Sequence, residues 1–179
     1  MTRAFVFPGQ GSQVVGMGKA LAEAFPAARL VFEEVDDALG QRLFKLMAEG
    51  PMDTLTLTEN TQPALMAVSV AVARVIESEG GKTLGEAAAC VAGHSLGEYS
   101  ALAAARAFAL PDAARLLRIR GKAMQAAVPA GEGAMAALLG VELADAFVNA
   151  FDDPRKFFPW LADPAEADKF IEVQKAKAA

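Results

Sequence analysis

Short apolar runs alternate along this chain with longer segments in which apolar residues recur every three or four positions. The runs at residues 4–7 and 87–92 lead into glycine-rich loops and predict buried strands, and a third run at 134–139 predicts another. The longer segments predict helices at residues 17–39 with a restart at Pro26, 43–47, 61–78, 96–105 and 111–128. This alternation predicts an α/β fold with a parallel sheet.

Local signals mark where the long helix at 61–78 begins and ends. Thr61 can cap its N-terminus, and Pro63 fits an early helical position, where the amide hydrogen that proline lacks would have no partner. Gly80 and Gly81 follow the last periodic residue and end the helix. We therefore expect this helix to begin at Thr61.

The chain changes character after residue 140, where aromatic residues become frequent. Residues 129–131 predict a linker, a break in regular structure that precedes the run at 134–139. Asp163, Pro164 and Glu166 form a helix start signal, with Asp163 as the cap. We expect a partly helical tail without a chemical role that its residues identify.

Composition narrows the classes of protein that this chain can belong to. Its 179 residues suit one domain, or one domain with a small appendage, and 54% of them are hydrophobic, enough to form a core. The formal net charge of −5 argues against a nucleic-acid partner. The single cysteine, Cys90, excludes an internal disulfide framework and offers no zinc-binding spacing. Since Cys90 lies in an apolar run, we expect it to be buried.

No targeting segment or membrane span is visible. The N-terminal apolar run is too short for the core of a signal peptide. The longest apolar stretch, at 64–76, is interrupted by Ser69 and Arg74 and is shorter than the roughly 20 residues that a membrane helix needs. We therefore expect a cytoplasmic protein that does not cross a membrane.

The sequence GHSLG at 93–97 contains a candidate nucleophile. Ser95 lies between Gly93 and Gly97 in the pattern G-x-S-x-G, after an apolar run and before a predicted helix. Such a strand–turn–helix holds a serine in a strained conformation and exposes its hydroxyl group. The amide of Leu96, at the start of the helix, is then the natural donor to an oxyanion. We interpret Ser95 as a nucleophile.

A serine nucleophile needs a base, and the only histidine in the sequence is His94. Neighbouring side chains point away from each other in an extended or sharply turned backbone. His94 is therefore poorly placed to take the proton of Ser95. We interpret His94 as a residue that braces the turn.

The second glycine-rich loop, GQGSQ at 9–13, follows the predicted strand at 4–7. It lacks the lysine of a P-loop and does not have G-x-G-x-x-G spacing. If the strands at 4–7 and 87–92 are neighbours, both loops lie at the same edge of the sheet. The amide of Gln10 can then act as a second oxyanion donor, and an ordinary tight turn is the alternative.

The predicted helix at 111–128 places Arg120 within its apolar stripe. A buried guanidinium needs an anionic partner, which is either a structural carboxylate or the carboxylate of a substrate, and helix geometry leaves both open. Arg115, Arg118 and Lys122 lie together on another side of the helix. That side is either a solvated face or a surface for CoA phosphates or an acidic protein.

Several stretches together resemble the malonyl-CoA:acyl carrier protein transacylase family and the related acyltransferase domains of fatty acid and polyketide synthases. The resemblance covers residues 3–141. The matching stretches are FVFPGQGSQ at 5–13, LTENTQPAL at 57–65, GHSLGEYSA at 93–101, RGKAMQ at 120–125 and GAMAALLG at 133–140.

The resemblance implies a role for each candidate residue. Ser95 would carry the acyl group as an ester, and the amides of Gln10 and Leu96 would form the oxyanion hole. Arg120 would bind the free carboxylate of the malonyl group, and His94 would have a supporting role. The malonyl group would pass from malonyl-CoA, the CoA thioester substrate, to Ser95 and then to the phosphopantetheine thiol of acyl carrier protein. No metal or other cofactor is implied.

The resemblance also predicts how the chain is divided. Residues 1–130 would form the N-terminal part of the large α/β domain, an incomplete hydrolase-like parallel sheet flanked by helices. Residues 131–141 would be the first strand of a ferredoxin-like small subdomain, and 142–179 an unrelated, partly helical tail. Family members are longer, so we expect a truncated or frameshifted gene product or an artificial or metagenomic fragment, and a degenerate paralogue is the alternative.

The catalytic histidine of the family belongs to a part of the fold that the resemblance does not reach. We therefore expect malonyl transfer by this chain to be impaired. Two alternatives stay open. One is a serine esterase of the α/β-hydrolase type, and the other is a non-catalytic remnant that binds an acyl-CoA or a carrier protein.

Overall fold

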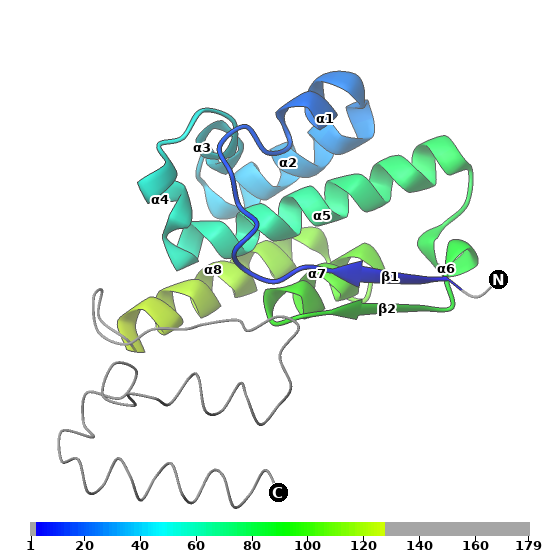
Figure 1. Ribbon diagram of the computed structural model, residues 1–179. Helices are drawn as coiled ribbons and strands as arrows, with labels where there is room; N and C mark the ends of the chain where they lie inside the picture. Colours follow the sequence, from blue (N-terminus) through cyan, green and yellow to red (C-terminus); the bar gives the residue numbers. More distant parts are fainter. Residues whose placement is uncertain (1–2, 128–179) are drawn as a thin grey trace, which may run out of the picture. The chain divides into compact units, whose positions relative to one another are not determined.

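Two strands and eight helices make up residues 3–127, the part of the chain that the computed structural model describes (Figure 1). The strands are β1 (Ala4–Phe7) and β2 (Cys90–Gly93). The helices are α1 (Lys19–Ala24), α2 (Pro26–Leu39), α3 (Leu43–Glu49), α4 (Met52–Thr56), α5 (Thr58–Gly80), α6 (Leu84–Ala87), α7 (Leu96–Ala104) and α8 (Leu110–Ala127). The predicted break at 129–131, the strand at 134–139 and the tail lie outside the described residues.

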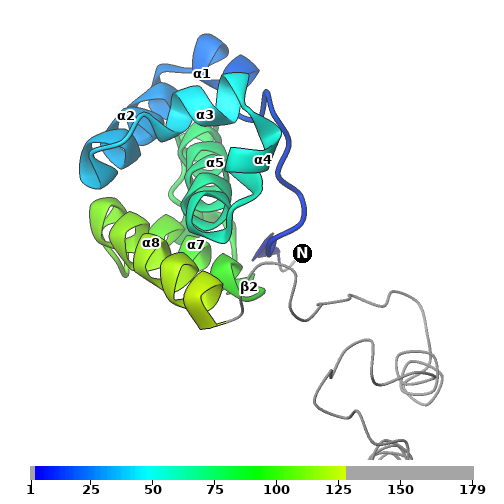
Figure 2. The same ribbon diagram turned by 90° about the vertical axis from the view of Figure 1, so that its left-hand side faces the viewer.

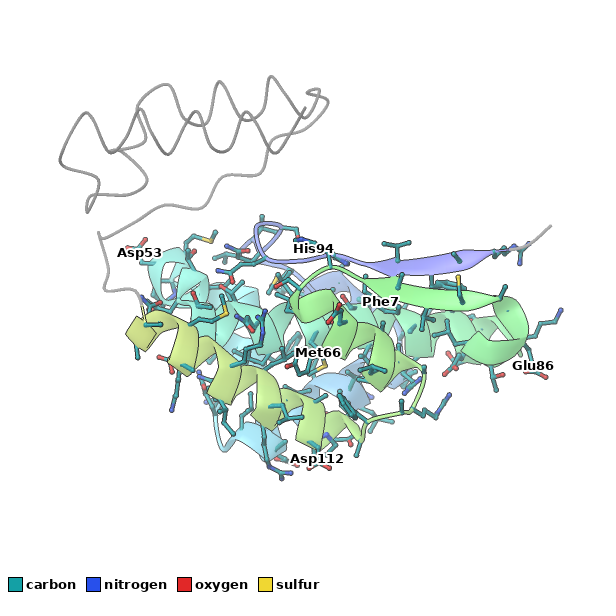
Figure 3. The ribbon with its side chains drawn as sticks, turned by 90° about the horizontal axis from the view of Figure 1, so that it is seen from below. Phe7, Asp53, Met66, Glu86, His94 and Asp112 are labelled. Atoms are coloured by element: carbon teal, nitrogen blue, oxygen red, sulfur yellow. The ribbon has the colours of Figure 1, made fainter. Side chains whose placement is uncertain are left out.

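The two strands pair in parallel, as the sequence predicts. Ala4 lies opposite Cys90, and Phe7 lies opposite Gly93. Both strands therefore end together, and the loops that follow them begin at the same edge of the sheet. α7 contacts both strands and also α5, so it links the sheet to the other helices. Figure 3 shows the two strands on one side of this part of the chain, with helices beneath them.

The prediction that both strands are buried is wrong within the described residues. Helices cover one face of the sheet, where Phe7 is 5% exposed, whereas Val6 on the opposite face is 74% exposed. Cys90 is exposed as well, which contradicts the expected burial of this residue. An apolar run predicts a strand, but it does not reveal whether both faces of that strand are covered.

The core lies among the helices around α5 (Figure 2). α5 packs against α2, α7 and α8, which explains why its middle is apolar on several sides rather than along one stripe. Phe32 of α2 stacks on Phe44 of α3, with ring centroids 4.5 Å apart. Large apolar residues that are at most 1% exposed come from α2, α3, α4, α5, α7 and α8; they are Phe32, Val35, Leu43, Met47, Leu55, Met66, Val70, Leu96 and Leu117.

The long helix begins earlier than the sequence predicts. α5 starts at Thr58, so Pro63 lies in its second turn. Thr61 does not cap the helix, because its hydroxyl donates a hydrogen bond to the carbonyl oxygen of Leu55 at 2.6 Å. The side-chain amide of Asn60 donates to the carbonyl oxygen of Thr54 at 2.8 Å. These contacts with α4 stabilise an additional turn that the local pattern does not reveal.

The other predicted helices agree with the structure to within a few residues, and α2 restarts at Pro26 as expected. The short helices α4 and α6 were not predicted, because one turn is too short for apolar periodicity. α6 nevertheless has a sequence signal, since Thr83 and Glu86 form a capping box. Because α6 extends to Ala87, β2 begins at Cys90 rather than at residue 87. None of the helices between residues 3 and 127 combines the length and apolar character that a bilayer crossing requires.

Candidate active site

Ser95 lies at the sharp turn between β2 and α7, the arrangement that the G-x-S-x-G pattern predicts. Its backbone has φ 56° and ψ −113°, a left-handed conformation that is strained for a residue with a side chain. Two backbone hydrogen bonds hold the turn. The amide of His94 donates to the carbonyl oxygen of Phe7 at 3.2 Å, and the amide of Gly97 donates to the carbonyl oxygen of His94 at 2.8 Å. The first of these bonds ties the turn to the end of β1.

Gly93 and Gly97 let three pieces of backbone meet at this turn. A Cβ atom on Gly97 would lie 2.9 Å from the carbonyl oxygen of Pro8 and closer still to that of Phe7. A Cβ atom on Gly93 would overlap the backbone of Gly97. Backbone atoms cannot rotate away as a side chain can. Both positions therefore require glycine for this strand–turn–helix to form beside β1.

The loop after β1 lies against His94. A Cβ atom on Gly9 would lie 2.5 Å from Nδ1 of His94, so the imidazole ring packs directly on the backbone of this loop. Figure 3 shows His94 at the end of the sheet from which both loops leave. This placement is compatible with the bracing role that the sequence predicts for His94, and that role stays a prediction.

The two predicted oxyanion donors follow the two strands. Gln10 lies in the loop after β1, and Leu96 is the first residue of α7. Within residues 3–127, neither backbone amide donates a hydrogen bond to another residue. The structure thus leaves both amides available at one edge of the sheet, and their role as an oxyanion hole stays a prediction.

Arg120 reaches from α8 to the turn at residues 93–97, the candidate nucleophile turn. Its Nη2 donates a hydrogen bond to Oγ of Ser95 at 2.9 Å, and its Nη1 donates to Oε1 of Gln62 at 2.7 Å. The guanidinium carbon lies 5.9 Å from the centre of the Tyr99 ring, within the range of a cation–π interaction. The structure therefore brings together two candidate residues that are 25 positions apart in the sequence.

The structural carboxylate that helix geometry allowed for Arg120 is not found in the described part of the chain. The ion pairs between residues 3 and 127 involve other arginines and lysines. Gln62 takes that place instead, as a neutral hydrogen-bond acceptor that is 1% exposed. Sequence reasoning missed Gln62 as a site residue. The available signal was a long amide side chain directly before Pro63, in a helix whose middle is apolar.

Arg118 contradicts the interpretation of its side of α8 as a solvated face. Its side chain is only 15% exposed. It donates to Oδ1 of Asn60 at 2.8 Å and to Oε1 of Gln41, and it lies 3.9 Å from Oε2 of Glu59. Burial lowers the pKa of Arg118, and the nearby charge of Glu59 opposes this effect. Arg118 therefore joins α8 to α5 and to the segment after α2.

The other two basic residues of that side, Arg115 and Lys122, remain at the surface. Lys122 lies 3.9 Å from Glu59, and Arg115 lies 3.1 Å from Asp112. The side chain of Lys122 is 64% exposed, and that of Arg115 is 54% exposed. Contact of these residues with CoA phosphates or an acidic protein stays a prediction.

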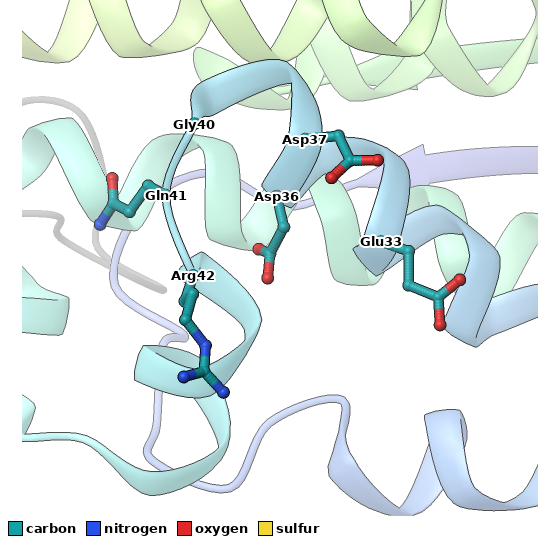
Figure 4. Close-up of a pocket in the computed structure, with 6 residues that line it drawn as sticks. All are labelled: Glu33, Asp36, Asp37, Gly40, Gln41 and Arg42. Atoms are coloured by element: carbon teal, nitrogen blue, oxygen red, sulfur yellow. The ribbon is translucent and has the colours of Figure 1, made fainter.

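A separate hollow of about 560 Å³ lies where α2 leads into α3 (Figure 4). It is lined mainly by polar residues and shares none of them with the site around Ser95. Burial raises the pKa of Asp36 in this hollow, although backbone hydrogen bonds oppose the effect. Oδ1 of Asp36 accepts a hydrogen bond from the amide of Phe44 at 2.8 Å, which stabilises the first turn of α3. Asp36 therefore has a structural role that explains its burial.

Enzymes that use a serine nucleophile for acyl chemistry have a serine in a strained strand–turn–helix with unbonded amides beside it, and this site resembles that class. Comparison with known protein families narrows this class. The model of the acyl transferase domain matches residues 4–155, which is most of the chain. The protein therefore belongs to the acyl transferase domain family. The match continues past residue 141, where the recognisable motifs end.

Curated relatives of this chain include several malonyl CoA-acyl carrier protein transacylases. The malonyl CoA-acyl carrier protein transacylases of Bacillus subtilis (strain 168) and Escherichia coli (strain K12) are 53% and 52% identical to this chain, each over 139 residues. These residues represent 78% of this chain but only 42% and 44% of the two relatives. The chain thus spans less than half the length of these curated relatives.

Solved structures show the same relationship. The acyl-carrier-protein-S-malonyltransferase of Bartonella henselae is 60% identical, with a TM-score of 0.76 over 84% of this chain and 48% of that one. A malonyl-transacylase determined in complex with a type II polyketide synthase acyl-carrier protein is 46% identical, also with a TM-score of 0.76. That match covers 87% of this chain and 49% of the other. The α/β arrangement is therefore that of acyltransferase structures.

Proposed function

We propose that this protein transfers a malonyl group from malonyl-CoA to the phosphopantetheine thiol of acyl carrier protein, through an ester on Ser95. The observation that carries the proposal is the 2.9 Å hydrogen bond between Arg120 and Ser95. In a malonyl thioester, a single methylene group separates the carboxylate from the reacting carbonyl. A cation that binds this carboxylate must therefore lie directly beside the nucleophile, as Arg120 does. The names of the relatives support the same reaction.

The first half of the reaction forms the ester. Oγ of Ser95 attacks the thioester carbonyl, the carbon–sulfur bond breaks, and CoA leaves as the thiolate or thiol. The amides of Gln10 and Leu96 donate hydrogen bonds to the carbonyl oxygen, which becomes negative in the transition state. Arg120 holds the malonyl carboxylate with charge-assisted hydrogen bonds. In the second half, the phosphopantetheine thiol attacks the ester and releases Ser95.

In this proposal, removal of the hydroxyl proton of Ser95 limits the rate of acylation. Arginine can only donate, so the hydrogen bond from Arg120 uses a lone pair of Oγ and leaves the hydroxyl hydrogen for another acceptor. The sequence has a single histidine, His94, which packs on Gly9. We assign His94 to bracing the turn, so the 179-residue chain would acylate Ser95 slowly. Loss of the base from a serine triad reduces turnover by about six powers of ten.

We also propose a division of the chain. Residues 1–130 belong to the large acyltransferase domain, and 131–141 begin the small subdomain. The predicted tail, 142–179, overlaps the family match, which reaches residue 155. Divergence from the family would therefore begin later than the motifs alone suggest.

Intact-mass spectrometry of the chain incubated with malonyl-CoA tests the ester. The expected result is a slow gain of one malonyl group, absent from Ser95→Ala and subsequently lost to the carrier protein's thiol. A His94→Gln variant should keep most of the acylation rate if His94 is a brace. An adduct that persists in Ser95→Ala would refute the assignment of the nucleophile.

The same preparation separates the proposal from its alternatives. An esterase would hydrolyse p-nitrophenyl esters faster than it acquires malonyl groups. A non-catalytic remnant would bind carrier protein equally well after Ser95→Ala and would never carry an acyl group. The position of Arg120 beside Ser95 favours an acyl group with a free carboxylate over an uncharged ester.

A further inference from the structure

Gln62 of α5 bridges two side chains that lie one turn apart on α8. Its Oε1 accepts a hydrogen bond from Nη1 of Arg120 at 2.7 Å, and its Nε2 lies 3.2 Å from Sδ of Met124. The orientation of this amide follows from chemistry, because a guanidinium can only donate and a thioether can only accept. The buried oxygen of Gln62 therefore faces Arg120.

This contact fixes the direction in which Arg120 presents its remaining donors. A guanidinium is planar, so holding Nη1 restricts the rotation of the whole group. The other terminal nitrogen, Nη2, then lies at Ser95, and the Tyr99 ring lies to one side of the group. Without Gln62, the long side chain of Arg120 could take other rotamers and leave the nucleophile turn.

The neutrality of Gln62 matters as much as its oxygen. A glutamate at this position would offer the same acceptor atom, but its negative charge would pair permanently with Arg120. The guanidinium would then attract a substrate carboxylate less strongly. An apolar residue would preserve the charge but lose the orientation. A buried neutral acceptor satisfies both requirements of a carboxylate-binding arginine.

We propose that Gln62 is a positioning residue that sets the acyl-group selectivity of this site, by holding Arg120 beside Ser95 without neutralising its charge. The inference rests on the proposed function, because it takes the malonyl carboxylate to be the ligand of Arg120. If Gln62 only packed in the core, its replacement would have a different effect. Replacing Gln62 would then change the stability of the protein, but it would not change the preference between acyl groups.

The test compares malonyl-CoA with acetyl-CoA, which lacks the carboxylate. The rate of Ser95 acylation by each thioester is measured by mass spectrometry for the parent, Gln62→Met and Gln62→Glu. Methionine has a similar length and suits an apolar environment, so it removes the acceptor with little change in packing. The expected result is a fall in the malonyl-to-acetyl ratio of roughly ten-fold or more in both variants, the effect of a lost charge-assisted hydrogen bond.

Gln41→Met is the matched control. Gln41 accepts a hydrogen bond from Arg118, on the same helix as Arg120, but it does not contact Arg120 or Ser95. Its replacement should leave the malonyl-to-acetyl ratio unchanged. Circular dichroism verifies that each variant retains its helices. If Gln62→Met does not fold, the malonyl-to-acetyl ratio of Gln62→Glu tests the inference. An unchanged ratio in a folded Gln62 variant would overturn the inference.

A binding measurement keeps the inference separate from catalysis. Calorimetry on Ser95→Ala gives the dissociation constants of malonyl-CoA and acetyl-CoA with and without the Gln62 substitutions. If the parent protein never acquires an ester on Ser95, the proposed function fails, yet a malonyl preference that depends on Gln62 would still support the inference. Equal affinity of Ser95→Ala for both thioesters would overturn it.

Discussion

The nucleophile turn and the interface between α5 and α8 contribute to the same site in different ways. The turn is built from residues that are adjacent in the sequence, and two glycines let the backbone of β1 approach it. The α5–α8 interface joins residues about 60 positions apart, through polar side chains such as the buried Gln62 and the largely buried Arg118. The turn therefore presents Ser95, the proposed nucleophile, whereas the interface determines which cation reaches it.

The largest effect is expected from Gly97→Ala, which should break the turn. The new Cβ atom would collide with the carbonyl oxygens of Phe7 and Pro8, and neither can move without separating β1 from α7. We expect a loss of at least about 3 kcal/mol in the free energy of unfolding, measured in urea, together with loss of Ser95 acylation. Gly85→Ala is the control, because nothing lies within 4 Å of its added Cβ atom. Equal stability of the two variants would contradict the assigned role of Gly97.

Gly121→Ala should separate α8 from α5. A Cβ atom on Gly121 would lie 2.6 Å from Cα of Glu59 and 2.8 Å from the carbonyl oxygen of Thr58. We expect a loss of about 1–3 kcal/mol in urea unfolding, and slower acylation by malonyl-CoA because Arg120 moves with the helix. Gly80→Ala has open space around the new atom and should be nearly neutral. If acylation by malonyl-CoA and by acetyl-CoA slowed equally, the movement of α8 would not act through Arg120, and the prediction would be wrong.

Arg118→Met should weaken the interface without changing selectivity. It leaves the oxygens of Asn60 and Gln41 without their guanidinium donor, which should lower the free energy of unfolding by about 1–2 kcal/mol. The malonyl-to-acetyl ratio should stay at the parent value, because Arg118 does not contact Ser95. Arg115→Met, at an exposed surface pair, should change stability by less than about 0.5 kcal/mol. A large change in selectivity would show that the two arginines of α8 are coupled.

The smallest effect concerns the pH dependence of stability at Glu77 of α5, which accepts hydrogen bonds from Leu84 and Arg106. Burial raises the pKa of Glu77, but hydrogen bonds from Arg106, the amide of Leu84 and Arg74 outweigh it and hold the pKa below its ordinary value of 4.5. A carboxylate with a lowered pKa stabilises the folded state above its unfolded pKa, and this contribution is lost as the pH falls through the folded pKa. The parent should therefore lose stability relative to Glu77→Gln as the pH drops below about 4.5, measured by urea unfolding at several pH values. Parallel pH profiles of the two proteins would contradict this role.

Part of the fold could be predicted because local patterns determine it. The strand at 4–7, the restart at Pro26 and the turn at Ser95 all depend on residues within a few positions of one another. The start of α5 could not be predicted in this way, since the bonds that stabilise its first turn go to carbonyl groups of α4. Cys90 was placed in the core for a similar reason, because an apolar run does not show which face of a strand is covered.

The sequence by itself determined the candidate nucleophile turn at residues 93–97, the glycines of that turn and membership of the acyl transferase domain family. These features depend on backbone conformations that short motifs encode. The tertiary structure alone decided that the two glycine-rich loops meet at one sheet edge, that Arg120 meets Ser95, that Gln62 holds it and that Arg118 is largely buried. The face that a helical residue presents to its neighbours depends on how distant helices pack, and periodicity within one helix does not contain that information.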